Sequence, residues 1–456
     1  MIISVRPQDM PGPSGSQPGN QSGPPAGLAG FVASLLGDDL PVTISAYDGS
    51  VAGAAEAAAG IEIRSPDAMR RLFTGPGELG AARAYVAGNL DVKGDLFTVL
   101  RLVERFPDLH MGARERLAVL QLVGLRALRP VRPPSEEVRL RGRQHRRERD
   151  AAAISHHYDI SNEFYRLLLG PAMTYSCAVW PGEDTTLEQA QAAKHELVCR
   201  KLGLEPGMRL LDVGCGWGGM LLHAARLHGV SAVGVTISAA QADCARRAVA
   251  AAGLSHRVEV RLQDYRDIDD GPYDAISSIG MFEHVGLAQL ATYFERLHTL
   301  LRPGGRLLNH GISTPRARTG RSKPTFINRY IFPDGELHEL GGVVSAMHRQ
   351  GLEVRHVESL REHYALTLRA WTSNLEGDWD AAVAEVGLSR ARIWRLYLAA
   401  CALAFDAGRV QVHQTLAVRP RTEPLRALSD MPPRPRWEDP PLAGNHIVGG
   451  GSRERD

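Results

Sequence analysis

The chain has 456 residues, 44% apolar and 23% charged, which is the balance of an ordinary globular protein. Its 53 basic and 51 acidic residues give a net charge of +2, so no global field selects nucleic acid, and no helix-turn-helix or basic-aromatic groove is evident. No run approaches the roughly 20 apolar residues of a membrane-spanning helix, which predicts a soluble or peripheral protein. Five scattered cysteines without metal-ligand spacing indicate reduced thiols in a cytosol, and no bound metal is expected.

Composition divides the chain into five segments. Residues 1–26 and 433–456 are rich in Pro, Gly and Ser, and we expect both to be disordered tails. Between them we expect a small α+β domain over 27–125, a linker over 126–149 and a catalytic domain over 150–432. In the small domain, the pattern predicts strands at 42–49 and 61–64, a helix capped at Ser65-Pro66, and further helices to about residue 105.

The linker carries nine arginines against three glutamates. Such a run is usually a solvated helix or connector. It could equally dock on an anionic membrane surface, where each basic residue contributes on the order of 1 kcal/mol. The sequence leaves both interpretations open.

The catalytic segment alternates strand and helix patterns. Seven strands are predicted, at 209–213, 232–236, 258–262, 275–279, 306–309, 353–357 and 410–417. This order predicts an α/β fold with a doubly wound parallel sheet, which binds its ligands at the carboxyl ends of the strands.

The most informative segment is 207–219, where an apolar strand pattern ends in a glycine loop (Gly214, Gly216, Gly218 and Gly219) that opens a helix. The Gly-x-Gly-x-Gly spacing differs from that of dinucleotide folds and resembles the first motif of S-adenosylmethionine (SAM) methyltransferases. A dinucleotide enzyme would usually place an acid at the end of the second strand. Residues 235–241 contain none, so Thr236 and Gln241 are the polar candidates there, and Gln241 also completes a capping box begun by Ser238.

Further motifs resemble the cyclopropane-fatty-acyl-phospholipid synthase family. They are His157–Phe164, Thr174–Cys177, Leu211–Gly218, Gly234–Ser238, Ser278–Val285, Tyr330–Pro333, His363-Tyr364 and Cys401. The resemblance covers roughly 45–420 and includes the small N-terminal domain that bacterial phospholipid synthases carry. It implies a Rossmann-like SAM-methyltransferase sheet.

The resemblance also implies a reaction and a setting. The methyl group of SAM is transferred to a cis double bond in an acyl chain of membrane phospholipid, and a bound bicarbonate deprotonates the resulting carbocation, which closes a cyclopropane ring. Such an enzyme is expected in the cytoplasm, peripheral to the inner face of the membrane. The oligomeric state stays open, with a homodimer as one alternative.

The family's bicarbonate positions fall on Cys177, Glu283, His310, Ile312 and Tyr364 in this sequence. His310 and Tyr364 can donate hydrogen bonds to an anion, backbone N–H groups near Cys177 and Ile312 can add more, and Glu283 can orient or accept. The resemblance also implies SAM contacts from Tyr175, Ser176, Gly214, Gly216, Gln241 and Asp264. Asp212, Gly218, Thr236 and Tyr265, in the glycine loop and at the strand ends, complete the expected cofactor residues. Candidates to line the pocket of the cation through cation–π attraction are Phe282, Tyr330, Phe332 and Tyr364.

Cys401 matches a family cysteine once regarded as catalytic. It lies in an apolar helix pattern with no nearby cation to lower its pKa, and methyl transfer to an alkene needs no thiolate, so we expect a packing role.

Two segments depart from the family pattern. His310-Gly-Ile312 replaces the more usual His-Thr-Ile, and Phe332-Pro-Asp-Gly-Glu-Leu-His338 replaces a common Phe-Pro-Gly/Asn-Gly-x-Leu-Pro. The variation resembles a branch that makes 10-methylene or methyl-branched chains, in which a hydride shift precedes proton loss. The product therefore stays open. An NAD-linked oxidoreductase is opposed by the glycine spacing, and a non-catalytic lipid-binding protein by the intact Glu283, His310 and Tyr364.

Overall fold

The computed structural model describes residues 27–37, 40–75, 77–104, 117, 120–122, 124, 128–138, 160–315, 325–333, 335–421 and 423. The expected tails at 1–26 and 433–456 lie outside these residues. So do His157 and the part of the linker from 139 to 149, which holds six of its nine arginines.

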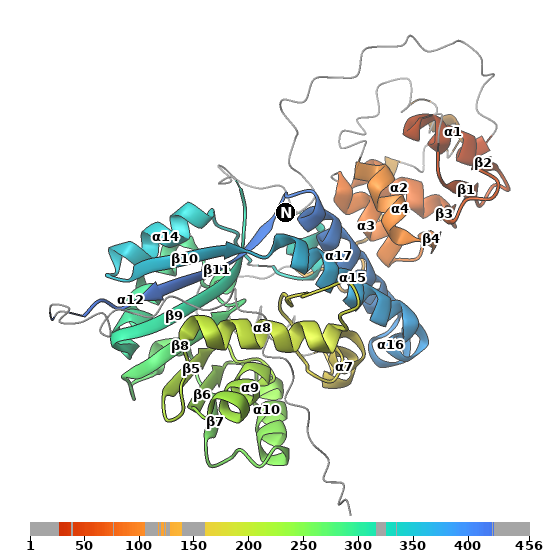
Figure 1. Cartoon of the computed structure of the whole chain (residues 1–456). Coiled ribbons are helices and arrows are strands. Elements are labelled where there is room, and N and C mark those ends of the chain that lie inside the picture. Colours follow the sequence, from red (N-terminus) through yellow and green to blue (C-terminus); the bar gives the residue numbers. More distant parts are fainter. Residues whose placement is uncertain are drawn as a thin grey trace, which may run out of the picture.

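The N-terminal residues form a small α+β unit (Figure 1). Its four-stranded sheet has the order β2-β1-β3-β4, in which β1 and β3 are parallel and the outer pairs are antiparallel. Its elements are α1 (Gly27–Leu36), β1 (Thr43–Ala46), β2 (Val51–Gly53), β3 (Ala59–Ile63), α2 (Pro66–Thr74), α3 (Glu78–Val86), β4 (Leu90–Gly94) and α4 (Leu96–Glu104).

Two features of this unit differ from the sequence prediction. The stretch expected to be helical as far as residue 105 is interrupted by β4, because pairing with β3 and burial of Val92 outweigh local helix preference. Helix α2 begins after Ser65 as predicted, but its side chain makes no cap hydrogen bond. The Ser65 hydroxyl instead accepts a hydrogen bond from Asn89 Nδ2 at 3.0 Å, which ties the helix start to the residue before β4.

The seven predicted strands of the catalytic domain form one sheet with the order β10-β11-β9-β8-β5-β6-β7. Their bounds are β5 (Arg209–Val213), β6 (Ser231–Thr236), β7 (Val258–Leu262), β8 (Tyr273–Ile279), β9 (Leu301–Ser313), β10 (Glu353–Ser359) and β11 (Gln411–Val418). The sheet is parallel except for β11, which runs antiparallel to both β9 and β10.

The connection between β10 and β11 explains the antiparallel strand, which corrects the expectation of a wholly parallel sheet. It consists of α15 (Arg361–Gly377), α16 (Trp379–Val386) and α17 (Leu388–Asp406). Helices α15 and α17 pack against each other, and Arg361 at the start of α15 donates to the carbonyl of Phe405 near the end of α17 at 2.5 Å. The chain therefore returns to the sheet edge that it left, and the next strand must run the opposite way.

Helices cover both faces of the sheet, as a doubly wound fold requires (Figure 1). On one face, Leu210 belongs to an apolar cluster that includes residues of α8 (Leu187–Leu202), α9 (Gly219–His228) and α10 (Ala239–Ala251). On the other, Leu211 and Val213 pack with residues of α12 (Leu290–Leu300) and α14 (Leu340–Arg349). Adjacent strand residues thus bury their side chains in opposite layers. The remaining helical segments are α7 (Asn162–Leu169), η2 (Tyr265–Asp267), α11 (Phe282–Val285), η3 (Leu287–Gln289) and α13 (Phe326–Tyr330).

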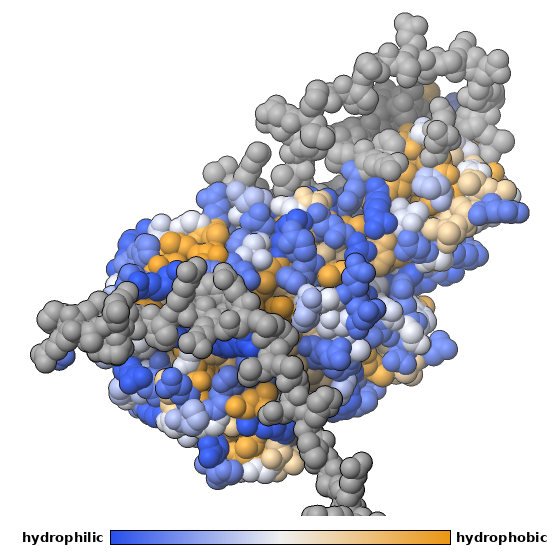
Figure 2. All heavy atoms as spheres, in the orientation of Figure 1, coloured by the Kyte–Doolittle hydropathy of each residue, from blue (hydrophilic) through white to orange (hydrophobic). Residues whose placement is uncertain are grey.

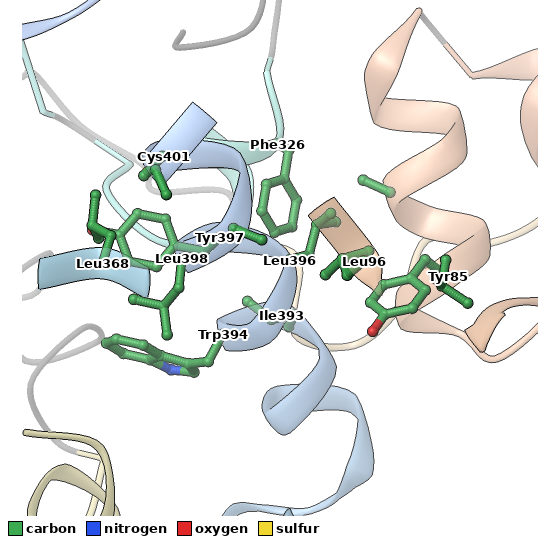
Figure 3. Close-up of a cluster of buried hydrophobic side chains, with 14 of the residues drawn as sticks. Tyr85, Leu96, Phe326, Leu368, Ile393, Trp394, Leu396, Tyr397, Leu398 and Cys401 are labelled. Carbon is green, nitrogen blue, oxygen red and sulfur yellow. The ribbon is translucent and has the colours of Figure 1, made fainter. Parts of the chain in front are cut away.

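Helix α17 joins the two domains. Figure 3 shows Tyr85 and Leu96 of the N-terminal unit beside Ile393 and Leu396 of α17, in a cluster that continues to Cys401. The interface is also polar, because Arg392 forms an ion pair with Asp91 at 3.0 Å. The N-terminal unit is therefore packed against the helix that reaches the candidate site.

The surface carries polar side chains with apolar patches between them, on both domains of the face shown in Figure 2. Within the part of the chain that the structure describes, no helix is long and apolar enough to cross a bilayer.

Candidate functional site

The glycine loop lies where β5 ends and α9 begins. Gly214 and Gly216 have φ values of 80° and 54°, which residues with a Cβ rarely adopt, so glycine is needed for this turn. A Cβ on Gly216 would meet no atom within 4 Å, because that position opens on a cleft. Gly218 has another role. A Cβ at this position would lie 3.2 Å from the Cβ of Ala245 on α10, so glycine allows the two helices to pack closely.

The cleft encloses about 1230 Å³, part of it open to solvent, at the carboxyl edge of the sheet. Nine of the ten predicted cofactor residues line it. They are Tyr175, Ser176, Asp212, Gly214, Gly216, Thr236, Gln241, Asp264 and Tyr265. Gly218 does not, because it is used for packing between α9 and α10.

The polar residues after β6 and β7 are held by local hydrogen bonds. Thr236 Oγ1 donates to Gln241 Oε1 at 2.9 Å, and Ser238 Oγ accepts from the Gln241 backbone at 3.3 Å. Only one half of the predicted capping box forms, because the Gln241 side chain turns to Thr236 at the cleft. The carboxylate of Asp264 forms an ion pair with Arg266, whose Nε lies 2.8 Å from Asp264 Oδ1. A ligand that binds this carboxylate therefore shares it with the guanidinium group.

Two buried ionisable side chains, Asp212 and Lys194, line the cleft. Asp212 accepts a hydrogen bond from Ser277 Oγ at 2.6 Å, and burial raises its pKa to about 6. Burial lowers the pKa of Lys194 to about 8, although the charge of Asp212 opposes this shift. Lys194 is not among the residues predicted from the sequence. The signal was a lysine four residues from both Ala190 and Val198, on the buried face of α8.

A second cavity of about 950 Å³ adjoins the first. Most of its wall is apolar, from residues such as Ile312, Ile327, Leu337, Leu368, Phe405 and Val412. The two cavities have four lining residues in common, namely Tyr175, Ser176, Gly280 and His284. His284 was not predicted as a site residue, and burial lowers its pKa to about 4, so it is neutral near pH 7.

Two of the predicted anion-binding residues present buried polar atoms in this cavity. Glu283 Oε1 accepts from the backbone N–H of Ile312 at 2.7 Å, and burial raises the pKa of Glu283 to about 7. Glu283 Oε2 and His310 Nε2 are buried and have no hydrogen-bond partner among the described residues. Because the N–H of Ile312 is already donated to Glu283, it is not free for a ligand in this arrangement.

The position of the proton on His310 follows from its neighbours. Lys201 Nζ donates to Gln414 Oε1 at 2.7 Å and also pairs with Glu358. Lysine can only donate, so the Gln414 oxygen faces it and Gln414 Nε2 donates to His310 Nδ1 at 3.2 Å. Burial and the nearby lysines hold the pKa of His310 well below its usual value. The imidazole is therefore neutral, with its proton on Nε2, as a donor in the cavity.

The other predicted residues divide between the wall and the surrounding core. Cys177, Tyr364 and Cys401 line the apolar cavity, and burial raises the pKa of both thiols. The Tyr364 ring lies 4.7 Å from that of Phe405. Cys177 Sγ is within 3.2 Å of the carbonyl of its neighbour Ala178, which leaves its thiol a packing role in this arrangement.

Of the aromatic candidates, Phe332 and Tyr364 line the cavity, and Phe282 and Tyr330 do not. The Tyr330 hydroxyl lies 3.3 Å from Glu137 Oε2, away from the cavity. The ring of Phe282 occupies the space that a side chain at position 311 would need, because a Cβ there would lie 1.8 Å from Phe282 Cε1. Gly311 is thus required by the packing of Phe282.

Comparisons with known proteins show the family of the chain. The profile of the mycolic acid cyclopropane synthetase family matches residues 145–415. A "probable fatty acid methyltransferase" of Mycobacterium tuberculosis is 46% identical over 87% of this chain and 95% of its own length. A cyclopropane-fatty-acyl-phospholipid synthase of Escherichia coli is 34% identical over 80% of this chain and 88% of its own. A structure of a mycolic acid cyclopropane synthase complexed with SAH and CTAB matches with a TM-score of 0.56 and 37% sequence identity. The match covers 59% of this chain and 98% of the other.

The doubly wound sheet, the glycine loop and the cleft at its carboxyl edge define a SAM-dependent methyltransferase. Within that class, the chain belongs to the mycolic acid cyclopropane synthetase family, which confirms the resemblance seen in its motifs.

Proposed function

We propose that the protein transfers the methyl group of SAM to a cis double bond in an acyl chain of membrane phospholipid and that the product is a cyclopropane ring. The observation that carries this proposal is the pair of adjoining cavities. A cleft with a glycine loop and polar strand ends suits the cofactor, and an apolar cavity suits a hydrocarbon chain. Their common wall brings a methyl donor in one close to an alkene in the other.

The residues of the apolar cavity act by positioning and by excluding water. An alkene is a poor nucleophile, so the rate depends on holding it in line with the sulfonium methyl group in a dry site. The rings of Phe332 and Tyr364 offer π faces to a developing carbocation. His284, which is neutral and buried, lies in the wall between the cavities without adding charge.

The unpartnered buried atoms of Glu283 and His310 fit a small anion with a hydroxyl group, such as bicarbonate. His310 Nε2–H would donate to it and Glu283 Oε2 would accept its hydroxyl. Lys194 and Lys201 add positive potential at His310, which favours an anion. When bound, bicarbonate supplies a base close to the new methyl carbon.

A second candidate product is a 10-methylene chain formed by a hydride shift before proton loss. The observation that favours it is Gly311, which stands beside His310 where the family pattern has threonine and which leaves the space of a side chain to the ring of Phe282. Both candidates use the same methyl transfer, and on both routes a proton leaves from the transferred methyl group. They differ in whether a hydride shift first moves the cation to the methyl-bearing carbon, which gives the methylene group instead of the ring.

The test is incubation of the full-length protein with SAM and vesicles of phosphatidylglycerol that carries cis-monounsaturated chains. Mass spectrometry should detect the gain of one CH₂ group per modified chain, and NMR should then distinguish ring protons from those of an exocyclic methylene. A Glu283→Gln protein that still binds SAM serves as the control. Absence of any mass gain with cis-unsaturated lipids would refute the proposed activity and favour a non-catalytic lipid-binding protein.

The substrate bond lies inside a bilayer, so we also propose that the protein docks at the membrane surface through its basic linker. Attraction to anionic head groups is screened over about 8 Å at physiological ionic strength, and vesicle binding should weaken as salt rises. A variant in which Arg143, Arg146 and Arg147 are replaced by glutamine should bind vesicles less tightly at low salt. Binding that ignores both salt and these substitutions would leave the linker a solvated connector.

A further inference from the structure

A cluster of metal-ligand side chains lies between α8 and α9, outside both cavities. Cys199 Sγ and one ring nitrogen of each of His223 and His228 lie within 4.8 Å of one another. Glu196 joins the group, because its Oε2 lies 3.2 Å from His223 Nε2 and 3.0 Å from His228 Nε2. Glu196 and Cys199 are three residues apart on α8, so both point to the same side of that helix.

The distances suit a tetrahedral ion. Ligand atoms at about 2.0–2.1 Å from zinc are separated from one another by about 3.3–3.4 Å in a tetrahedron, and a thiolate at about 2.3 Å lies about 3.6 Å from a nitrogen ligand. The two separations between histidine and Glu196, 3.0 and 3.2 Å, are already near the first value. The thiol lies within 4.8 Å of one ring nitrogen of each histidine, so it needs to approach these nitrogens by about 1.2 Å at most to reach the second value.

The surroundings also suit a metal site. Cys199 is fully buried, and the side chains of His223 and His228 are 12% and 18% exposed. One thiolate, one carboxylate and two neutral imidazoles balance the charge of a divalent ion. The outer contacts orient the ligands, because Arg200 Nε donates to Glu196 Oε1 at 3.0 Å and the backbone of Leu204 hydrogen-bonds His228.

We propose that Glu196, Cys199, His223 and His228 bind one structural zinc ion, or a divalent ion of similar preference. Sulfur and imidazole ligands favour zinc over magnesium or calcium, and four protein ligands leave no open position for catalysis. The ion joins α8, which carries Lys194 of the cofactor cleft, to α9, which begins at the glycine loop. Its effect is to hold these two cofactor-binding elements together.

The experiment uses untagged full-length protein, stripped with a chelator, reloaded with zinc, desalted and analysed by mass spectrometry for metal. We expect about one zinc per chain in the wild type and less than about 0.2 in Cys199→Ser and in His223→Ala. Cys244→Ser is the matched control, since Cys244 lies on α10 outside the cluster and this variant should keep the metal. Zinc should also raise the melting temperature of the wild type by about 3 °C. The melting temperature of Cys199→Ser should not change on adding zinc.

Cobalt substitution provides a second readout that does not depend on the variants folding. Wild-type protein loaded with Co²⁺ should develop a thiolate-to-cobalt charge-transfer band, and Cys244→Ser should retain it. The proposal is overturned if the wild type takes up less than about 0.2 zinc per chain or lacks this band. Metal uptake by folded Cys199→Ser equal to that of the wild type would overturn it as well.

Discussion

Replacing Gln414 by methionine tests whether the contacts from Lys201 to His310 set the position of the imidazole proton. The substitution keeps the length of the side chain in β11 and removes both the donor to His310 Nδ1 and the acceptor for Lys201. Without the donor, the proton can move to Nδ1, and Nε2 then presents a lone pair to the cavity in place of N–H.

The size of the effect follows from the bonds that are lost. The contact of 3.2 Å between Gln414 and His310 is a neutral hydrogen bond, worth about 0.5–1.5 kcal/mol net. Since 1.4 kcal/mol corresponds to a factor of ten, turnover should fall about two- to tenfold through the tautomer alone. Lys201 loses one buried acceptor but keeps Glu358, so the free energy of unfolding should fall by about 1–3 kcal/mol.

The assay separates turnover from binding. Steady-state methyl transfer from radiolabelled SAM to vesicles should show the fall in kcat, while calorimetry should show a SAM Kd unchanged within about twofold. Thr415→Val, at the next buried position of β11, is the control for general loss of stability and should keep its turnover. A folded Gln414→Met protein with wild-type turnover would refute the assigned role of these contacts.

Three further predictions concern the apolar cavity and its wall. Glu283→Gln should lower turnover about 100-fold or more with SAM binding by calorimetry unchanged, because the carboxylate is needed after the cofactor has bound. A turnover unchanged by this substitution would contradict the assignment. Burial raises the folded pKa of Glu283 to about 7, so the free energy of unfolding should fall as pH rises from the unfolded pKa of about 4.5 through about 7. Chemical unfolding of Glu283→Gln at the same pH values should lack this fall. Cys401→Ser should keep substantial activity, since burial raises the pKa of that thiol and keeps it protonated; complete loss in a folded protein that binds SAM would restore a chemical role. Gly311→Ala should destabilise the protein by about 1–3 kcal/mol in thermal unfolding through its clash with Phe282, and Phe282→Leu in the same chain should recover part of the loss; equal stability of Gly311→Ala and wild type would show that the ring moves freely.

The strands and the cofactor cleft could be predicted well from local patterns. Apolar runs between helical segments mark buried parallel strands, and the carboxyl ends of such strands meet at one edge, so Asp212, Thr236 and Asp264 were expected to meet at the cleft. Gly218, which the same motif predicts as a cofactor residue, does not line the cleft. A Cβ there would meet Ala245, which is 27 residues away, and nothing in the motif itself reports that packing.

The residues that sequence analysis missed are long-range neighbours. Lys194 and His284 lie in helices, where a charged or imidazole side chain is usually on the solvent side. The proposed metal ligands come from two helices more than 20 residues apart in sequence, so no short cysteine–histidine spacing announced them. β4 was missed because a five-residue edge strand is defined by its partner β3 more than by its own composition.

The sequence by itself determined the class of fold, the glycine turn and most of the residues that line the cleft and the apolar cavity, because periodicity, positive φ and chemical type are local properties. Only the tertiary structure decided which of those residues have unpartnered polar atoms, how Gln414 sets the proton on His310, why Gly311 stands beside Phe282, and that β11 runs antiparallel. Each of these depends on contacts between segments far apart in the chain, whose free energy comes from burial and pairing rather than from local preference.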